Sequence, residues 1–151
     1  MGPFSILMAN RGNKVIANDL NPDCIFYLKK NAELNKVQSN LCGFNMDARE
    51  FIRLSVSDPS ILNINSDFLP INHFYMNLPL DAIEFLDAFI GIYKGKTEFN
   101  DPKIHIYAFS EFKEESQALI ELSKRMTFAF KGIYNFKESD IEELYPVRDV
   151  S

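Results

Sequence analysis

The sequence predicts an α/β fold in which a mainly parallel sheet carries helices on both faces. Two observations predict it. Short apolar runs alternate with amphipathic segments along the whole chain, and a polar residue follows directly after three of the runs. Strands that alternate with helices favour parallel pairing, and such sheets bind ligands beyond the carboxyl ends of their strands. At 151 residues the chain has the length of one domain.

The first predicted unit is a helix, a strand and a second helix. Residues 2–11 form an amphipathic helix that Gly12 closes, and residues 14–18 form a buried strand. Asn21 and Pro22 suit the N-cap and first turn of a helix that runs to about residue 35. The apolar residues on one side of the first helix are Phe4, Leu7 and Met8, and those facing inward on the second are Ile25, Leu28 and Ala32.

The strand and helix pattern then repeats. Residues 41–45 are a short strand, residues 47–54 a helix, and residues 55–66 an irregular loop around Pro59. Residues 71–76 are the third strand, and an amphipathic helix is expected over residues 81–93. The buried stripe of that helix is Ile83, Leu86, Ile90 and Tyr93.

The last part of the chain continues the alternation. After a loop at 94–101, residues 103–109 are a strand, residues 114–126 a helix, and residues 145–151 a last strand. Leu119, Leu122 and Met126 are expected to face inward. Because the chain begins with a helix and ends within a strand-like run, we expect the first central strand and the last strand of the sheet to be missing from it.

Composition restricts the class of protein. The hydrophobic fraction of 46% and the charged fraction of 25% are those of a globular protein, and no apolar run approaches the length of a membrane span. Cys24 and Cys42 are expected to be buried free thiols. The net charge of −5 is unfavourable for binding a phosphate backbone, so any RNA substrate would be held largely by something outside this chain.

Two acidic residues follow predicted strands at positions where a nucleoside could bind. Asp19 could accept hydrogen bonds from both hydroxyls of a ribose, or it could simply cap the following helix. Asp47 could accept from an adenine amino group while the backbone N–H of Ala48 meets a ring nitrogen. Taken alone, Asp47 also suits the N-cap of the next helix.

Asn77 is the strongest candidate for a role in chemistry. It ends the third strand, and Leu78 and Pro79 separate it from the helical pattern, so a capping role is less natural. Its amide offers both donors and an acceptor to the edge of a purine, and Pro79 would fix the direction of the backbone. His73 and His105 are too isolated in the sequence to form a metal site, and we expect no metal.

Four segments occur in order along the chain: Gly2-Pro3-Phe4-Ser5-Ile6, Asn18-Asp19-Leu20-Asn21-Pro22, Asp47-Ala48-Arg49, and Met76-Asn77-Leu78-Pro79 with Ala82-Ile83-Glu84-Phe85-Leu86-Asp87. A late segment runs from Val147 to Ser151. Together they resemble the eukaryotic and archaeal tRNA (guanine-N1)-methyltransferase family that modifies the guanosine 3′ of the anticodon.

The resemblance implies a Rossmann-like class I fold that binds S-adenosylmethionine, with residues 1–151 as a partial catalytic domain. It places Gly2 in the cofactor turn, Asp19 and Leu20 at the ribose, and Asp47 and Ala48 at the adenine. Asn77 and Pro79 would form the catalytic corner, with Asn77 between the methionine moiety and the target guanine. The partner would be the tRNA anticodon stem-loop, and the complete protein would be a monomer.

Several parts of the family pattern are not found in this sequence. They are the strand and turn before Gly2, the acidic residue that takes the N1 proton, the RNA-binding domain and the final strand. Guanine N1 that keeps its proton is a poor nucleophile, so we expect the isolated chain to bind the cofactor weakly and to be inactive. The expected compartment is cytoplasm, nucleus or mitochondrial matrix, neither secreted nor in a membrane.

Two other functions stay open on the sequence. A related enzyme of wybutosine synthesis transfers the aminocarboxypropyl group of the same cofactor, and it shares the fold and the ribose-binding Asp. The Asn-Leu-Pro segment and Gly-Pro-Phe favour the methyltransferase. The chain could also be a non-catalytic interaction fragment, which the missing strand and the negative charge favour.

Overall fold

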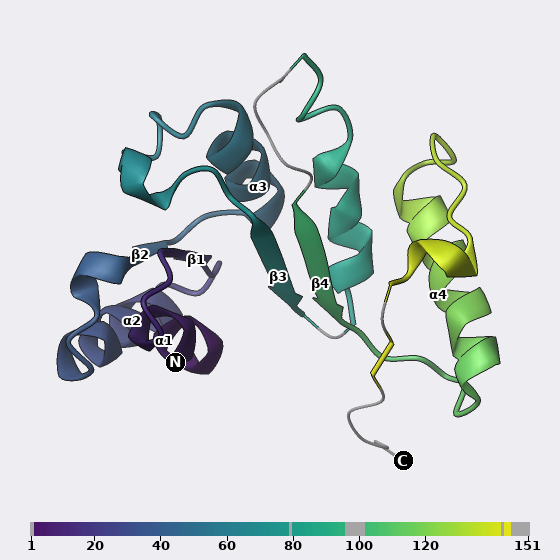
Figure 1. Ribbon diagram of the computed structural model, residues 1–151, viewed down its shortest axis with the longest axis horizontal. Helices are drawn as coiled ribbons and strands as arrows, with labels where there is room; N and C mark the ends of the chain where they lie inside the picture. Colours follow the sequence, from purple (N-terminus) through teal and green to yellow (C-terminus); the bar gives the residue numbers. More distant parts are fainter. Residues whose placement is uncertain (1, 79, 96–101, 143, 146–151) are drawn as a thin grey trace. The chain divides into compact units, whose positions relative to one another are not determined.

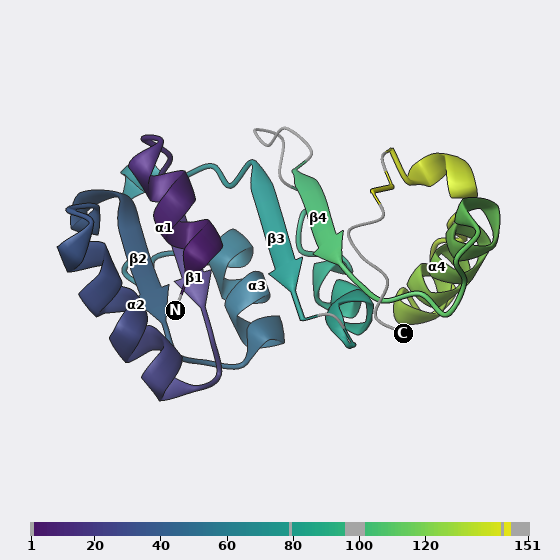
Figure 2. The same ribbon diagram turned by 90° about the horizontal axis from the view of Figure 1, so that it is seen from below.

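The computed structural model describes residues 2–78, 80–95, 102–142 and 144–145 (Figures 1 and 2). The chain forms two compact units. Unit 1 comprises Met1–Asn72 and Gly91–Asp101, and unit 2 comprises His73–Ile90 and Pro102–Ser151. Each unit is described by itself.

Unit 1 is built on two parallel strands with helices packed against them (Figure 2). Its strands pair in the register Val15↔Leu41 to Asn18↔Phe44, which confirms the parallel arrangement predicted for this part of the sequence. Its elements are α1 (Pro3–Asn10), β1 (Val15–Asn18), α2 (Pro22–Leu34), η1 (Gln38–Asn40), β2 (Leu41–Phe44), α3 (Ala48–Ser57) and η2 (Ser66–Phe68).

Helix α2 begins where its local sequence predicts. The Asn21 side chain accepts a hydrogen bond from the backbone N–H of Asp23, and Pro22 occupies the first turn, where no intrahelical N–H bond is needed. The predicted inward residues Ile25, Leu28 and Ala32 are all buried. They share one apolar core with Ala9, Val37 and Leu41.

The inward face of α1 differs from the prediction. Phe4 and Leu7 are about half exposed, whereas Ala9 is buried and Ile6 packs on the core. The small residues explain the difference: a Cβ atom added to Gly2 would lie 2.2 Å from Cδ1 of Leu28. Close approach at Gly2 therefore accompanies a rotation of α1 in which Ile6 and Ala9, rather than Phe4 and Leu7, face the core.

Helix α3 is longer than predicted and replaces the start of the expected loop. It runs to Ser57, and the buried Ser55 hydroxyl donates to the carbonyl of Ile52. A serine whose hydroxyl bonds to its own helix can be buried with its polar group satisfied. Turns and η2 fill the rest of the predicted loop.

Unit 2 is a second parallel strand pair, with one face against a helical segment (Figure 2). The register runs from His73↔Lys103 to Asn77↔Tyr107. Phe74 is buried and meets the ring of Phe89 edge to face, with centroids 4.9 Å apart, while its neighbours His73 and Tyr75 are exposed. The elements are β3 (His73–Asn77), η3 (Ala82–Phe89), β4 (Lys103–Tyr107), α4 (Glu115–Ala129) and η4 (Glu138–Asp140).

The segment after β3 is a 3-10 helix rather than the α-helix predicted over residues 81–93. Its buried residues Ile83, Leu86 and Phe89 recur every third position, which is the period of a 3-10 helix. Ile90 adopts an extended backbone and ends the helix, and Gly91 follows at a φ of 75°. Because the helix is wound more tightly, Phe89 is buried in place of Ile90 and Tyr93, which the α-helical spacing predicted to be buried.

The buried residues of helix α4 are small. Ala118, Ser123 and Ala129 are buried, and the predicted Leu119, Leu122 and Met126 are half-buried.

The predicted last strand lies outside the described residues apart from Tyr145, which is 72% exposed and without regular structure. Most of the predicted loop 94–101 also lies outside them. Within the described ranges, no helix is long and apolar enough to cross a membrane.

Candidate functional site

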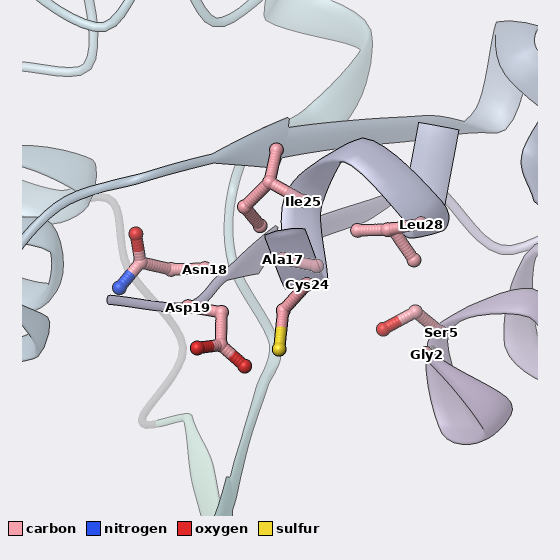
Figure 3. Close-up of a pocket in the computed structure, with 8 residues that line it drawn as sticks. All are labelled: Gly2, Ser5, Ala17, Asn18, Asp19, Cys24, Ile25 and Leu28. Carbon is pink, nitrogen blue, oxygen red and sulfur yellow. The ribbon is translucent and has the colours of Figure 1, made fainter. Parts of the chain in front are cut away.

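A pocket opens in unit 1 at the carboxyl end of β1 (Figure 3). The polar atoms of Ser5, Asp19 and Cys24 point toward the same space, and α2 supplies apolar side chains beside them. The lining residues are Gly2, Ser5, Ala17, Asn18, Asp19, Cys24, Ile25 and Leu28. The structure thus brings together two predicted site residues, Gly2 and Asp19.

Asp19 is half-buried in this pocket and is not the cap of the following helix. Its Oδ1 accepts from the backbone N–H of Asn21 at 2.9 Å, and Asn21 provides the cap instead. Removal from water raises the pKa of the Cys24 thiol, and a hydrogen bond to Asp19 raises it further. The Asp19 carboxylate beside it therefore disfavours the thiolate form of Cys24. Leu20, beside Asp19, is 73% exposed.

Gly2 occupies a position that requires glycine. Its φ of 75° and ψ of 42° lie in the left-handed region, and α1 begins at the next residue. A side chain there would meet Leu28 as well as strain the backbone. The backbone at Gly2 can therefore approach both the pocket and the core.

Asp47 is the N-cap of α3. Its Oδ1 accepts from the backbone N–H groups of Arg49 and Glu50, at 2.9 and 3.1 Å, so the capping interpretation of this residue is confirmed. Ala48 is the first residue of the helix, directly after the loop that follows β2. Capping uses one carboxylate oxygen, which leaves a ligand role for Asp47 untested.

Asn77 is the last residue of β3, in unit 2, and its side chain is exposed. The carbonyl of Leu78 accepts from the N–H groups of Asp81 and Ala82, at 3.0 and 2.7 Å, so the chain turns directly after Asn77. Pro79 lies outside the described residues. Two of the predicted site residues thus belong to different units: Asp19 belongs to unit 1 and Asn77 to unit 2.

Arg125, which no sequence motif singles out, connects the segments that follow the two strands of unit 2. Arg125 of α4 donates to the carbonyls of Leu80 and Phe109, at 3.2 and 2.8 Å, and pairs with Glu121 at 3.2 Å. The two carbonyls belong to the segments that follow β3 and β4. One side chain thus links the ends of both strands of unit 2.

His73 and His105, which lie far apart in the sequence, are neighbours in the structure. They lie on adjacent strands, with Nδ1 of His73 and Nε2 of His105 3.0 Å apart, and Tyr75 stacks on His105 at 4.3 Å. Strand register, which the sequence does not state, brings them together. In the part of the chain that the structure describes, no three His, Cys, Asp or Glu side chains form a group that could hold a metal ion.

Two asparagines at strand ends were also missed. Asn18 ends β1 and Asn45 follows β2, and each side chain bonds to the backbone of the other strand's loop. The sequence carries a signal for them, because in both cases an Asn stands between an apolar run and an acidic residue. Their bonds connect the loop of Asp19 to the loop of Asp47.

Unit 1 is an α/β unit with a pocket at the carboxyl end of a parallel strand, the end at which such sheets generally bind their ligands. The sequence profile of the TRM5/TYW2 methyltransferase domain matches residues 1–129. The chain belongs to this family, and membership implies a methyl donor.

Curated relatives agree with the family. The chain is 39% identical to a tRNA (guanine(37)-N(1))-methyltransferase of Paramecium tetraurelia, in a match that covers 100% of the chain and 34% of the relative. Enzymes of the same name from Danio rerio and Vitis vinifera are 39% and 40% identical, over 80% and 76% of the chain and 25% and 18% of the relatives. The chain thus spans about a third or less of their lengths. No solved structure matches it.

Proposed function

We propose that this chain is the cofactor-binding part of a tRNA (guanine-N1)-methyltransferase. The methyl group would pass from S-adenosylmethionine to N1 of the guanosine 3′ of the anticodon. The observation that carries the proposal is the Asp19 pocket at the end of β1, in a chain whose family and relatives are methyltransferases.

The chemistry of the pocket suits an adenosine group. A carboxylate beside a strand end can accept from both ribose hydroxyls, and Ala17, Ile25 and Leu28 offer an apolar wall. In this proposal Asp19 and Leu20 contact the ribose. Asp47 and the backbone of Ala48 contact the adenine, and the backbone of Gly2 approaches the cofactor closely.

Asn77 would hold the target guanine so that N1 faces the methyl group, with Pro79 shaping the corner. The cofactor supplies an activated methyl group on its sulfonium. The protein's part is mainly alignment, which can contribute roughly 7 to 11 kcal/mol at best. The base that removes the N1 proton would come from outside this chain.

For the architecture, we propose one Rossmann-like class I sheet to which both strand pairs contribute. Both pairs are parallel, and among the described residues β1 pairs only with β2 and β3 only with β4. A central strand and a last strand from outside this chain would complete the sheet. Residues 1–151 would then be a partial catalytic domain, and tRNA binding by the anticodon stem-loop would depend largely on the rest of a longer, monomeric protein.

The test of cofactor binding is a calorimetric titration of the chain with S-adenosylmethionine. We expect affinity weaker than micromolar, and weaker still in Asp19→Ala. Equal affinity of the wild-type chain and Asp19→Ala would remove Asp19 from the site.

The test of the reaction uses a chimera in which this chain replaces the matching region of the Paramecium relative. We expect transfer to an unmodified tRNA transcript, with a product nucleoside heavier by one methyl group. A product heavier by an aminocarboxypropyl group would instead support the wybutosine-pathway enzyme, and no product would support the non-catalytic fragment.

The role of Asn77 is tested in the same chimera. Asn77→Ala should lower turnover at least about tenfold, since misalignment of a reacting group by a small distance is costly. The exposed Asn135 of unit 2 provides the matched control, and Asn135→Ala should leave turnover unchanged. Unchanged turnover in Asn77→Ala would remove Asn77 from the mechanism.

A further inference from the structure

Asn18 and Asn45 form a reciprocal link between two loops of unit 1. The Asn18 amide donates from Nδ2 to the carbonyl of Met46 at 2.9 Å and accepts at Oδ1 from the Met46 N–H at 3.2 Å. The Asn45 amide donates from Nδ2 to the carbonyls of Asp19 and Leu20, at 2.9 and 2.8 Å. Each asparagine thus reaches from its own strand end to the backbone beyond the other strand.

These bonds begin where the sheet ends. The paired register of β1 and β2 stops at Asn18↔Phe44, and one more backbone bond joins the N–H of Asp19 to the carbonyl of Phe44 at 3.2 Å. Beyond that point the two loops diverge toward α2 and α3. The asparagine amides extend the strand ladder by side-chain bonds where main-chain pairing has ended.

We propose that Asn18 and Asn45 are positioning residues for the nucleoside part of the cofactor. The proposal rests on the proposed function, in which the ribose and the adenine of one ligand are contacted by the two linked loops. A rigid ligand that spans two loops binds more tightly when their spacing is fixed beforehand, because less freedom is lost on binding. The Asn45 hydrogen bonds restrain the backbone at Asp19 and Leu20, and the Asn18 hydrogen bonds restrain Met46, the residue before Asp47.

The amide group is required for this role. Asn45 acts as a donor to two carbonyls, and an Asp of the same size offers no donor when ionised. Asn18 both donates and accepts, so Asn18→Asp keeps the bond from the Met46 N–H and loses the other. The two Asn→Asp changes therefore have unequal expected effects, with Asn45→Asp the larger.

The experiment is an NMR titration of the full 151-residue chain with adenosine, which measures millimolar affinities. We expect Asn45→Asp to weaken binding about tenfold and Asn18→Asp about threefold, as loss of one or two hydrogen bonds predicts. Asn35→Ala is the matched control. It removes an exposed amide bond, from Nδ2 of Asn35 to the carbonyl of Asn31 at 2.8 Å, outside both loops, and should leave affinity unchanged.

A double-mutant cycle separates positioning from general destabilisation. If Asn45 acts by positioning Asp19, then Asn45→Asp should weaken adenosine binding less in an Asp19→Ala background than alone, whereas independent losses of stability would add. If Asn45→Asp leaves the affinity for adenosine unchanged while Asp19→Ala weakens it, the positioning role of the two asparagines is overturned. The proposed function would still stand in that case. Additive effects in the cycle would also overturn it. No adenosine binding by the wild-type chain would overturn the proposed nucleoside site itself, and the link with it.

Discussion

The two units secure the ends of their parallel strands by different chemistry. In unit 1, two neutral amides at the strand ends bond to backbone groups of the neighbouring loop. In unit 2, a single guanidinium from a distant helix bonds to Leu80 and Phe109, with Glu121 as its counter-ion. The first arrangement is local and uncharged, and the second depends on a cation brought from 45 residues away in the sequence.

The difference indicates how the two ends respond to substitution. Neutral hydrogen bonds contribute about 1 kcal/mol each, so unit 1 distributes its support over several weak bonds. A charged donor shared by two carbonyls contributes more, and its removal also leaves the Glu121 carboxylate without its counter-ion, with only the Ser110 hydroxyl still donating to it. The end of unit 2 should therefore be the more sensitive to a single change.

The largest expected effect follows from removing the cation. Arg125→Met should lower the free energy of unfolding by about 2 to 4 kcal/mol, because two carbonyls lose a charged donor. Arg125→Lys should recover only part of this, since an ammonium lacks the planar fork that reaches both carbonyls. Urea denaturation measures both. We expect Asn18→Ala to lower the free energy of unfolding by about 1 kcal/mol. If Arg125→Met lowers it by no more than that, the end of unit 2 is not the more sensitive of the two.

A smaller effect is expected at the start of unit 1. Gly2→Ala should destabilise the chain by about 1 to 3 kcal/mol, because it combines a left-handed backbone with a new contact on buried Leu28. Gly12→Ala is the matched control, with a φ of 87° and no heavy atom within 4 Å of the added Cβ. It should show the backbone strain alone. Equal losses in the two variants would mean that contact with Leu28 is readily relieved.

The smallest effect concerns a surface pair of unit 2. Lys103 donates to Glu142 at 2.9 Å, and this bond and the lysine charge lower the pKa of Glu142. A lowered pKa in the folded state means that the pair stabilises the fold above the ordinary pKa of glutamate and loses this as pH falls through the folded value. Lys103→Met should raise the pKa of Glu142, measured by NMR titration. Lys124→Met, an exposed lysine of α4, should leave it unchanged.

The parts of unit 1 that the sequence predicts best are those with local signals. Asn21 and Pro22 define the start of α2 by capping chemistry, and the 3.6-residue spacing of Ile25, Leu28 and Ala32 identifies its buried face. Asp19 and Gly2 were predicted to lie in one site and do line one pocket. The capping and spacing signals act within a few residues, so the sequence alone contains them, whereas the joint placement of Gly2 and Asp19 came from the family resemblance.

The failures lie where distant residues decide the outcome. The meeting of His73 and His105 depends on strand register, and the role of Arg125 depends on how α4 packs. The segment after β3 has apolar residues compatible with either helical period, and packing of Phe89 on Phe74 accompanies the 3-10 form. The inward faces of α1 and α4 were mistaken because packing against neighbouring elements, rather than apolar spacing along the helix, decides which residues face the core.

The cysteines and histidines of this chain can report separately on the unfolding of its two units. Its two cysteines, Cys24 and Cys42, are both in unit 1, and its two histidines, His73 and His105, are both in unit 2. Thiol labelling therefore follows the opening of one half, while imidazole proton resonances follow the other. With no tryptophan and no introduced label, the wild-type chain can show whether its halves unfold together or one after the other.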